Sequence, residues 1–341
     1  MNYRPLGRSG LITSELALGT MIFGETSGRA TPPAEARRLI DRYLDAGGNH
    51  FDTADVYAGG RSEEIVGEAI RGRRDRVLVA TKARFRWREG DVNAEGLSRH
   101  NLTTGVEASL RRLGTDYLDL LYLHCFDPVT PLAETLRALD DLVRAGKVRY
   151  LGVSNFKAWQ LMKAQGLLGQ IARLTFVAAQ YQYSLVKRDL EYEFDDLLPA
   201  EGLGLVPWGP LGGGFLTGKY TREGPTEGRI ATTAEETEES WSRRDTERNW
   251  GILDAVRAVA ATHDATPTQV AIAWLLQRPI VSTVLLGART LAQLDDNLGA
   301  RHVTLSEENI GRLNGASALP ELYPYRMIRD YGGRSMTRDA T

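Results

Sequence analysis

The sequence predicts an α/β fold, a (β/α)8 TIM barrel, on two observations. Short apolar runs typical of buried parallel strands recur along the chain, separated mostly by helix-like segments. The residues at the ends of seven runs mostly follow one another at the spacing of one strand plus one helix: Asp52, Lys82, His124, Asn155, Gln180, Trp208 and Gly287. A further strand near residues 16–19 makes eight units. That number favours a barrel over a doubly wound sheet, which usually has fewer strands and an early Gly-rich nucleotide turn.

The elements follow in order along the chain. Residues 2–13 alternate short apolar pieces about a Gly-Arg-Ser-Gly turn, which predicts an N-terminal β-hairpin. Helical patterns at 34–46 and 62–71 flank the strand and loop HFDTADVY, residues 50–57. The later strands are expected in these runs: VLVATK, LDLLYLH, YLGVSN, FVAAQYQ, GLVPWG and STVLLGA.

Helix start and stop signals support the helices between these strands. Thr130 and Pro131 suit an N-cap and first turn, and Gly146 suits the stop of the same helix. Two extra helices, at 248–262 and 267–277, are expected before the last strand. Thr266 and Gln269 have the spacing of a capping box at the start of the second one.

No composition shift marks a second domain, so we expect one domain over residues 1–341. A long loop after the seventh strand contains a polar, acid-rich stretch at about 221–247, which is either a solvated loop or a lid over a cofactor or substrate. The tail at about 316–341 is aromatic and Gly-punctuated, and we expect it on the barrel rim. Its last few residues are expected to be loose.

Composition excludes several classes of function. The 341 residues are 42% hydrophobic and 25% charged, and the formal net charge of -2 offers no attraction for nucleic acid or an anionic membrane. The N-terminus lacks the apolar stretch of a signal peptide, which makes the cytoplasm the expected location. One cysteine excludes an intramolecular disulfide framework, and the five histidines lack zinc-ligand spacing, so no metal site is expected.

Four residues at the predicted mouth of the barrel suit proton transfer. In a barrel the C-terminal strand ends meet at one mouth, where Asp52, Lys82 and His124 would lie with Tyr57 on the adjacent loop. We expect Lys82 to lower the pKa of Tyr57 and Asp52 to hold Lys82 in place. Neutral His124 could donate a hydrogen bond to a carbonyl oxygen as negative charge develops there. The set suits protonation of an alkoxide formed by hydride addition.

Each of these residues also has a structural interpretation. Asp52 and Lys82 alone are equally consistent with a buried ion pair, Tyr57 with a rim aromatic, and His124 with a core histidine. Lys82 could instead be a Schiff-base nucleophile of a lyase, although a neighbouring carboxylate keeps a lysine charged. Placement of all four at one mouth favours the catalytic interpretation.

Two stretches suit phosphate groups. Residues 209–220, GPLGGGFLTGKY, nearly match the phosphate-loop pattern, but Tyr220 stands where a Ser or Thr should bind magnesium. The stretch is either a plain turn or a glycine loop that holds a diphosphate together with Lys219. Arg289 precedes a predicted helix N-terminus, which suits either a phosphate contact or a surface arginine.

The residues resemble the aldo-keto reductase family from about residue 3 to 325. The motifs that carry the resemblance are these: LALGT, FDTADVYAGGRSEEIVGEAI, VATK, LDLLYLH, TLRALDDLVRAGKVRYLGVSNF, AAQYQYSL, VPWGPLGGGFLTGKY and GARTLAQLDDNL. The resemblance implies a single-domain barrel oxidoreductase that uses NADP(H), with NADH less favoured, and no Rossmann fold. It implies reduction of an aldehyde or ketone, including keto sugars and other keto alcohols, or the reverse reaction.

The resemblance also assigns roles to residues. The implied catalytic residues are Asp52, Tyr57, Lys82 and His124, with Tyr57 as general acid or base. The implied cofactor contacts are Gly19, Thr20, Asp52, Ser154, Asn155, Gln180, Trp208, Gly209, Leu211, Gly213, Leu216, Lys219, Gly287, Arg289, Gln293 and Asn297. The implied substrate pocket is formed by Phe23, Tyr57, Trp87, His124, Trp241 and Tyr325. The expected partner is a small carbonyl or alcohol substrate, and the protein could be a monomer or a homo-oligomer.

Two departures from the family pattern bear on the cofactor. Gly209 replaces a serine that is common after the stacking aromatic residue, here Trp208. Gly287 and Ala288 replace a Lys-Ser pair of some members, and Gln293 replaces an arginine. Arg289 is expected to compensate for these replacements and to favour NADPH over NADH. Some relatives with this barrel are cofactor-binding subunits of channels, which leaves a regulatory subunit with little turnover as the alternative.

Overall fold

The computed structural model describes residues 1–25, 30–225 and 228–332, which form a (β/α)8 barrel closed at its base by a hairpin. The antiparallel hairpin consists of β1 (Tyr3–Pro5) and β2 (Ile12–Ser14). The barrel strands are β3 (Leu16–Gly19), β4 (His50–Asp52), β5 (Leu78–Ala83), β6 (Leu118–Leu123), β7 (Val148–Ser154), β8 (Phe176–Gln182), β9 (Gly204–Trp208) and β10 (Val284–Leu286). All neighbouring barrel strands are parallel, in the order β10-β3-β4-β5-β6-β7-β8-β9, and a bridge between Leu205 and Val281 closes the ring.

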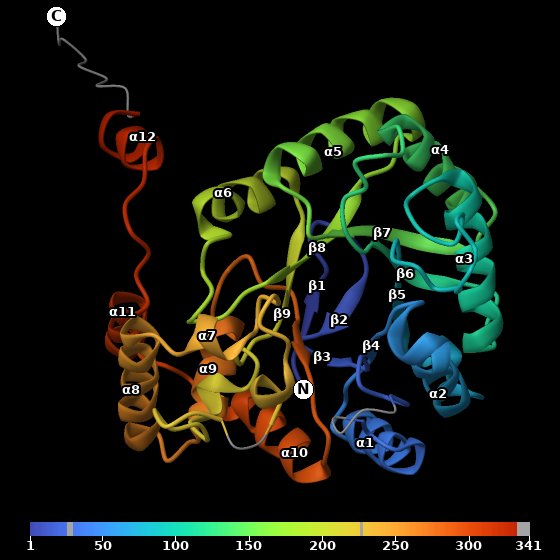
Figure 1. Ribbon diagram of the computed structural model, residues 1–341. Coiled ribbons are helices and arrows are strands. Elements are labelled where there is room, and N and C mark those ends of the chain that lie inside the picture. Colours follow the sequence, from blue (N-terminus) through green and yellow to red (C-terminus); the bar gives the residue numbers. More distant parts are fainter. Residues whose placement is uncertain (26–29, 226–227, 333–341) are drawn as a thin grey trace, which may run out of the picture.

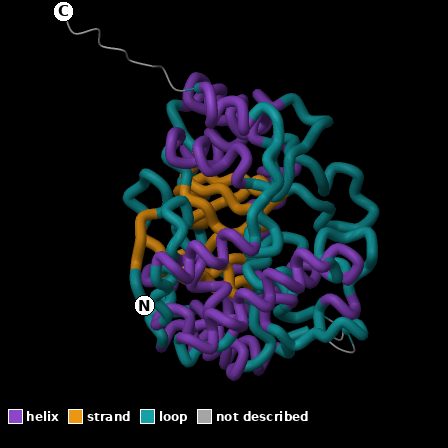
Figure 2. The backbone as a smooth tube through the Cα atoms, turned by 90° about the vertical axis from the view of Figure 1, so that its left-hand side faces the viewer, coloured by secondary structure: helices purple, strands orange, loops and turns teal. Residues whose placement is uncertain are grey.

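Helices surround the strands, as Figures 1 and 2 show from two directions. Within the described residues the helices are α1 (Pro33–Asp45), α2 (Arg61–Ile70), α3 (Arg99–Leu113), α4 (Leu132–Arg144), α5 (Ala158–Ala172), α6 (Glu191–Glu201), α7 (Trp241–Arg244), α8 (Glu247–Thr262), α9 (Pro267–Leu276), α10 (Leu291–Gly299), α11 (Glu307–Ala316) and α12 (Tyr325–Tyr331). The prediction of a barrel with an N-terminal hairpin, extra helices and a long loop after the strand that ends at Trp208 is confirmed. None of the described helices is both long and apolar enough to cross a lipid bilayer.

Alternation along the strands divides the core in two. In β6, Leu120 and Tyr122 face a small cluster inside the barrel, whereas Leu121 packs in the large layer between strands and helices. Leu6 from the hairpin is fully buried in the inner cluster and thus fills the barrel from below. Filling from below leaves the other end of the barrel, where the C-terminal strand ends meet, open for a site.

The capping predictions had two outcomes. The capping box of α9 is confirmed, because Thr266 Oγ1 accepts from the Gln269 N–H and Gln269 Oε1 accepts from the Thr266 N–H. The N-cap predicted at Thr130 for α4 is wrong. Pro131 occupies that position, and the Thr130 hydroxyl instead donates to Asp127 at 2.6 Å.

The tail touches the barrel at only a few places. After α11 the chain runs to α12, which stands off from the ring of helices in Figure 1. Tyr325 stacks on Tyr192 at 5.1 Å and donates to Glu193, so the contact is with the start of α6. Residues 333–341, for which a loose end was predicted, lie outside the described residues.

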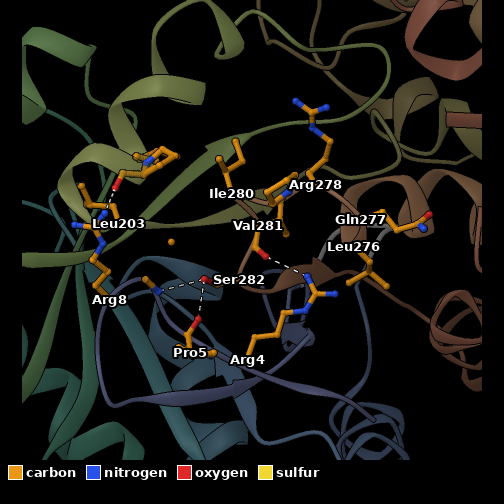
Figure 3. Close-up of a pocket in the computed structure, with 16 residues that line it drawn as sticks. Arg4, Pro5, Arg8, Leu203, Leu276, Gln277, Arg278, Ile280, Val281 and Ser282 are labelled. Carbon is orange, nitrogen blue, oxygen red and sulfur yellow. Dashed lines mark hydrogen bonds between the residues drawn. The ribbon is translucent and has the colours of Figure 1, made fainter. Parts of the chain in front are cut away.

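A cavity of about 580 Å³ lies at the base of the barrel, between the hairpin and the connections that lead into β9 and β10 (Figure 3). Its arginines are bonded to the protein: Arg4 donates to the Val281 carbonyl at 3.2 Å, and Arg8 donates to the Pro199 carbonyl at 2.8 Å. Ser282 donates to the Pro5 carbonyl and ties the hairpin to β10. The base therefore serves stability, whereas the predicted chemistry belongs to the opposite end.

Candidate active site

The candidate site is a cavity of about 890 Å³ at the C-terminal ends of the barrel strands. Asp52, Tyr57 and His124 line one part of it, and Arg289 and Asn297 line the part beside α10. The volume is within the range of small-molecule and cofactor pockets. The cavity is thus a channel that leads from three of the predicted catalytic residues to the residues predicted to hold a phosphate.

The centre of the site is the fully buried ammonium of Lys82. Its Nζ bonds to Asp52 Oδ1 in a very short contact, donates to the Thr53 carbonyl at 2.8 Å, and lies 3.3 Å from the Tyr57 hydroxyl. The second oxygen of Asp52 accepts from Gln180 Nε2 at 2.7 Å. The strand ends of β4, β5 and β8 thereby place a charged pair directly behind the phenol of Tyr57.

The pKa shifts differ from the sequence-based expectation in one respect. Burial raises the pKa of Tyr57, and although the ammonium of Lys82 acts to lower it, burial prevails. Burial alone would lower the pKa of Lys82, but the charge of Asp52 and the contact with Tyr57 raise it above its usual value. In the fold as described, Tyr57 is therefore a protonated phenol beside a protonated lysine at neutral pH.

His124 follows β6 and is held from both neighbouring strands. Its backbone N–H donates to the Ala83 carbonyl at 3.1 Å, and its backbone carbonyl accepts from Asn155 Nδ2 at 2.9 Å. The imidazole meets the Tyr57 ring edge-on at 5.9 Å. Burial, followed by the charges of Lys82 and Arg84, lowers the pKa of His124 well below its usual value. The ring is therefore neutral near pH 7 and can donate one hydrogen bond.

The predicted nicotinamide contacts lie beside this centre. Ser154, Asn155 and Gln180 all line the cavity, and Ser154 Oγ donates to the Gln180 carbonyl at 2.8 Å. Asn155 adopts a left-handed backbone conformation, φ 55°, which brings its amide to both the Ser154 hydroxyl and the His124 carbonyl. These amides form a polar wall next to Tyr57.

The glycine stretch after β9 forms a left-handed loop along the cavity. Gly209, Gly212, Gly213 and Gly214 all have positive φ, so L side chains there would be strained. A Cβ atom on Gly209 would also lie 2.9 Å from the Glu239 carboxylate. The loop therefore gives a physical reason for glycine at 209, where the family pattern often has serine.

The end of the glycine stretch and the long loop that follows it contribute positively charged side chains to the same cavity wall. Lys219 and Arg229 line the cavity, and Arg229 pairs at 2.5 Å with Glu239, whose side chain is buried. Ser240 and Arg244 are also buried, so this part of the 221–247 stretch is packed against the barrel. Residues 226–227 lie outside the described residues.

The end of the cavity beside α10 is built around the start of that helix. The Arg289 N–H donates to Gln293 Oε1 at 2.9 Å, and Asn297 Nδ2 donates to the Gly287 carbonyl at 3.1 Å. Thr266 Oγ1 donates to Asp296 at 2.8 Å across the cavity wall. A guanidinium next to a helix N-terminus is a favourable environment for a phosphate.

Apart from Lys82, which is buried behind Tyr57, five predicted site residues do not line the cavity. Leu216 is fully buried in a short 3₁₀ turn, and Phe23 is fully buried in the outer core. Trp241 packs against Tyr220 and Trp250, and Trp87 donates to Asn101 at the start of α3. Tyr325 lies on α12 against Tyr192. All five side chains pack against other residues, and the structure does not place them on the wall of this cavity.

Other residues take those wall positions. The lining residues that the sequence reasoning missed include Met21, Ile22, Val56, Phe85, Arg229, Thr266, Pro267, Thr268 and Asp296. Three of these residues could have been inferred from their neighbours in the sequence. Met21 and Ile22 directly follow the predicted contact Thr20, and Val56 directly precedes Tyr57. No pattern in the sequence identifies Arg229, which reaches the cavity from the long loop.

The residues present fit a nicotinamide dinucleotide. The cavity connects the amide wall near Tyr57 with the glycine loop and then with Arg289, which corresponds to the order of nicotinamide, diphosphate and adenosine in the cofactor. Gly213 and Gly214 line the cavity without a side chain, which permits the close approach to the backbone that a diphosphate needs. All the predicted cofactor contacts except Leu216 line this one cavity.

Comparison with known proteins gives a family. Residues 15–318 match the model of the Aldo/keto reductase family. The chain is 36% identical over 308 residues to a probable voltage-gated potassium channel subunit beta of Oryza sativa subsp. japonica, a match that covers 89% of this chain and 92% of the relative. It is 36% identical over 327 residues to the uncharacterized oxidoreductase YrpG of Bacillus subtilis (strain 168), covering 92% and 95%. It is 33% identical over 349 residues to versiconal hemiacetal acetate reductase of Aspergillus parasiticus, covering 95% and 99%.

Proposed function

The chain belongs to the aldo/keto reductase family, and we propose that it is an NADP(H)-dependent oxidoreductase that reduces an aldehyde or ketone to the alcohol, or catalyses the reverse reaction. The observation that carries the proposal is the bonding of Lys82 to both Asp52 and Tyr57 at the mouth of the cavity. This arrangement holds a proton where a carbonyl oxygen would need one. The substrate is a small carbonyl compound, and keto sugars and other keto alcohols are within this class.

In the proposed mechanism Tyr57 is the general acid of reduction and the general base of alcohol oxidation. The cofactor, when bound, supplies or accepts a hydride at its nicotinamide ring. As negative charge develops on the substrate oxygen, the phenol of Tyr57 transfers its proton, and the ammonium of Lys82 stabilises the phenolate that results. Asp52 fixes Lys82 and keeps it charged. A raised phenol pKa ensures that the proton is present at neutral pH.

His124 has the role of orienting the substrate. Its ring is neutral near pH 7 and lies edge-on to the Tyr57 ring, so it can donate to the same carbonyl oxygen without adding a second proton. In the part of the chain that the structure describes, Nδ1 of His124 is buried and has no hydrogen-bond partner. Either ring nitrogen could carry the donated hydrogen, because the tautomer depends on what is bound.

The cofactor preference is proposed from the part of the cavity beside α10. Arg289 lies beside the N-terminus of α10 and favours the additional phosphate of NADPH. Asp296, also on the wall, opposes a further negative charge, although it accepts a hydrogen bond from Thr266. NADPH is therefore the preferred partner, and NADH the weaker one.

The Schiff-base alternative is disfavoured by the surroundings of Lys82. A nucleophilic lysine needs a depressed pKa, whereas the pKa of Lys82 is raised by Asp52 and Tyr57 against the effect of burial. Its Nζ is also engaged by the Thr53 carbonyl. The lysine therefore acts as a fixed charge.

The test of the proposal is the variant Tyr57→Phe. It removes the acidic hydroxyl and keeps the ring, so we expect kcat for an aldehyde with NADPH to fall by about 10²–10⁴-fold. NADPH binding, followed by cofactor fluorescence, should change little because the ring still fills its place. The matched control is Tyr3→Phe, which removes a hydroxyl bonded to the Gly47 carbonyl at the barrel base. Full turnover by Tyr57→Phe would rule out the mechanism.

A second candidate function is a cofactor-binding regulatory subunit with little turnover. The observation in its favour is the likeness to a relative named as a probable potassium channel subunit beta. An intact set of Asp52, Tyr57, Lys82 and His124 favours the enzyme. Tight NADPH binding without oxidation of NADPH across a panel of aldehydes, ketones and keto sugars would reverse this preference.

A further inference from the structure

Arg84 lies beside the candidate catalytic histidine. Along β5, Ala80 and Lys82 face the barrel interior, and Arg84 comes two residues later. The register of β5 and β6 pairs Lys82 with Tyr122 and Ala83 with Leu123. The hydrogen bond from the His124 N–H to the Ala83 carbonyl extends this ladder by one step. The next pair along it is Arg84 and His124.

Side-chain contacts agree with this placement. The guanidinium carbon of Arg84 lies 5.2 Å from the centre of the Phe85 ring, and that ring lies 4.7 Å from the His124 ring. Phe85 lines the cavity and is 37% exposed. Phe85, a lining residue, thus contacts both the guanidinium of Arg84 and the ring of His124.

The charge of Arg84 is not balanced by an acid. Within residues 1–25, 30–225 and 228–332, no carboxylate pairs with its guanidinium, and its buried Nε has no hydrogen-bond partner. The other cations near Tyr57 are paired, Lys82 with Asp52 and Arg229 with Glu239. Arg84 is not itself among the residues that line the cavity, but its guanidinium is an uncompensated positive charge close to the part of the wall formed by Phe85 and His124.

We propose that Arg84 determines specificity by binding a carboxylate on the carbonyl substrate. The inference rests on the proposed function, because it adds a substrate class to the same site. A guanidinium presents paired donors that match a carboxylate, and its attraction is stronger in a partly buried cavity than in water. Met21, Ile22 and Val56 line the cavity and suit an apolar substrate body. The substrate class is therefore an aldehyde or ketone with an apolar body and one carboxylate.

The experiment compares 4-carboxybenzaldehyde with its neutral methyl ester, methyl 4-formylbenzoate, using NADPH. The protein should prefer the acid. In Arg84→Gln the ratio of kcat/KM for acid over ester should fall about tenfold, mainly through KM for the acid, because one charge-assisted contact is lost. Arg84→Lys retains the charge without the paired donors and should restore part of the preference.

The control is Arg88→Gln, four residues along the same loop. Arg88 is exposed and pairs with Asp91 at 3.3 Å, so its loss should leave the acid-to-ester ratio unchanged. A native preference for the ester, or an equal loss for both substrates in Arg84→Gln, would overturn the inference while leaving the reductase proposal intact. Absence of turnover of either substrate by the native protein would instead contradict the proposed function.

Discussion

The carboxylate of Asp52 is satisfied on both oxygens, one by Lys82 and one by Gln180. A charge removed from water is tolerated only with such partners, so the pair is stable although both side chains are buried. The consequence for chemistry is a lysine whose charge is fixed and whose position does not drift. In the proposed mechanism, Tyr57 therefore has a charged neighbour of fixed position when it gives up its proton.

A second buried carboxyl, Asp55, has no such arrangement. It is 1% exposed, and no side chain among the described residues bonds to either of its oxygens. Burial, together with the carboxylate of Glu63, raises the pKa of Asp55 well above its usual value. The folded protein therefore holds the Asp55 proton more tightly than the unfolded chain does.

This shift predicts a pH-dependent effect on stability. The contribution of Asp55 is fully present below the usual pKa of 3.8 and is lost as pH rises through the raised folded pKa. Asp55→Asn removes that loss, so its Tm should exceed that of the native protein by a few degrees at pH 8, and by less at pH 5. Thermal unfolding in matched buffers measures the difference.

The control for this prediction is Asp75→Asn, because Asp75 is exposed on the surface. Its Tm should follow the native protein at both pH values. A gain in Asp55→Asn that does not depend on pH would show that burial of the amide, and not loss of the titration, is responsible.

At the scale of residues, the sequence predicted which chemical groups lie together better than it predicted how deeply they are buried. Asp52, Tyr57, Lys82 and His124 were expected to lie together because strand ends in a barrel converge, and the structure brings them together. The direction of the Tyr57 pKa shift was predicted wrongly, because it is decided by how deeply the phenol is buried, which the sequence does not contain. Phe23 and Trp241 were misplaced for the same reason, since an aromatic residue in a loop packs equally well in a core or in a wall.

At the scale of elements, contacts between helices are set by small residues. Gly67 lies in α2 against α3, and a Cβ atom there would come 2.4 Å from the Leu113 carbonyl oxygen. Unlike the end of a flexible side chain, this backbone oxygen cannot move aside to make room for an added Cβ atom. Gly166 lies in α5, and a Cβ atom there would meet nothing within 4 Å.

These two glycines give opposite predictions for the same substitution. Gly67→Ala must push α2 from α3 and should lower the free energy of unfolding by about 1–3 kcal/mol. Gly166→Ala should raise it by about 0.5–1 kcal/mol, because alanine is the better residue inside a helix. Urea titrations of both variants measure the change. Equal effects of the two would mean that the close approach of α2 to α3 does not matter.

Element prediction succeeded where a pattern has a physical period. The strands ending at Asp52 and Gln182 were expected because buried parallel strands are continuous apolar runs, and the α9 capping box because its two residues bond to each other's backbone. The N-cap of α4 was misplaced because Thr130 has a competing partner in Asp127, three residues before it. Such competition is visible only once the loop is folded.

At the scale of the molecule, stability and chemistry occupy opposite ends of the barrel. Leu6 fills the barrel from the base and is fully buried, whereas the candidate site lies at the other end. Leu6→Ala should lower the free energy of unfolding by about 2–5 kcal/mol, because it leaves a cavity in a packed interior. The folded variant should keep the native kcat/KM, because no group at the mouth changes.

Urea titration and steady-state kinetics on the same preparation test this separation. Leu322→Ala is the matched control, because Leu322 is 45% exposed and its truncation should change neither quantity. A fall in kcat/KM of folded Leu6→Ala protein would show that packing at the base reaches the mouth.

The bond between Gln180 and Asp52 also has a consequence for synthesis of the protein. The two residues are 128 positions apart, so during translation the carboxylate exists long before its amide partner. Lys82 emerges from the ribosome early enough to pair with Asp52. The second oxygen of Asp52 has only water as a hydrogen-bond donor until β8, which contains Gln180, has been synthesised. Closure of the ring needs β10, which follows about a hundred residues later still. The charged centre is therefore assembled in stages, and its buried, fully bonded form belongs only to the nearly complete chain.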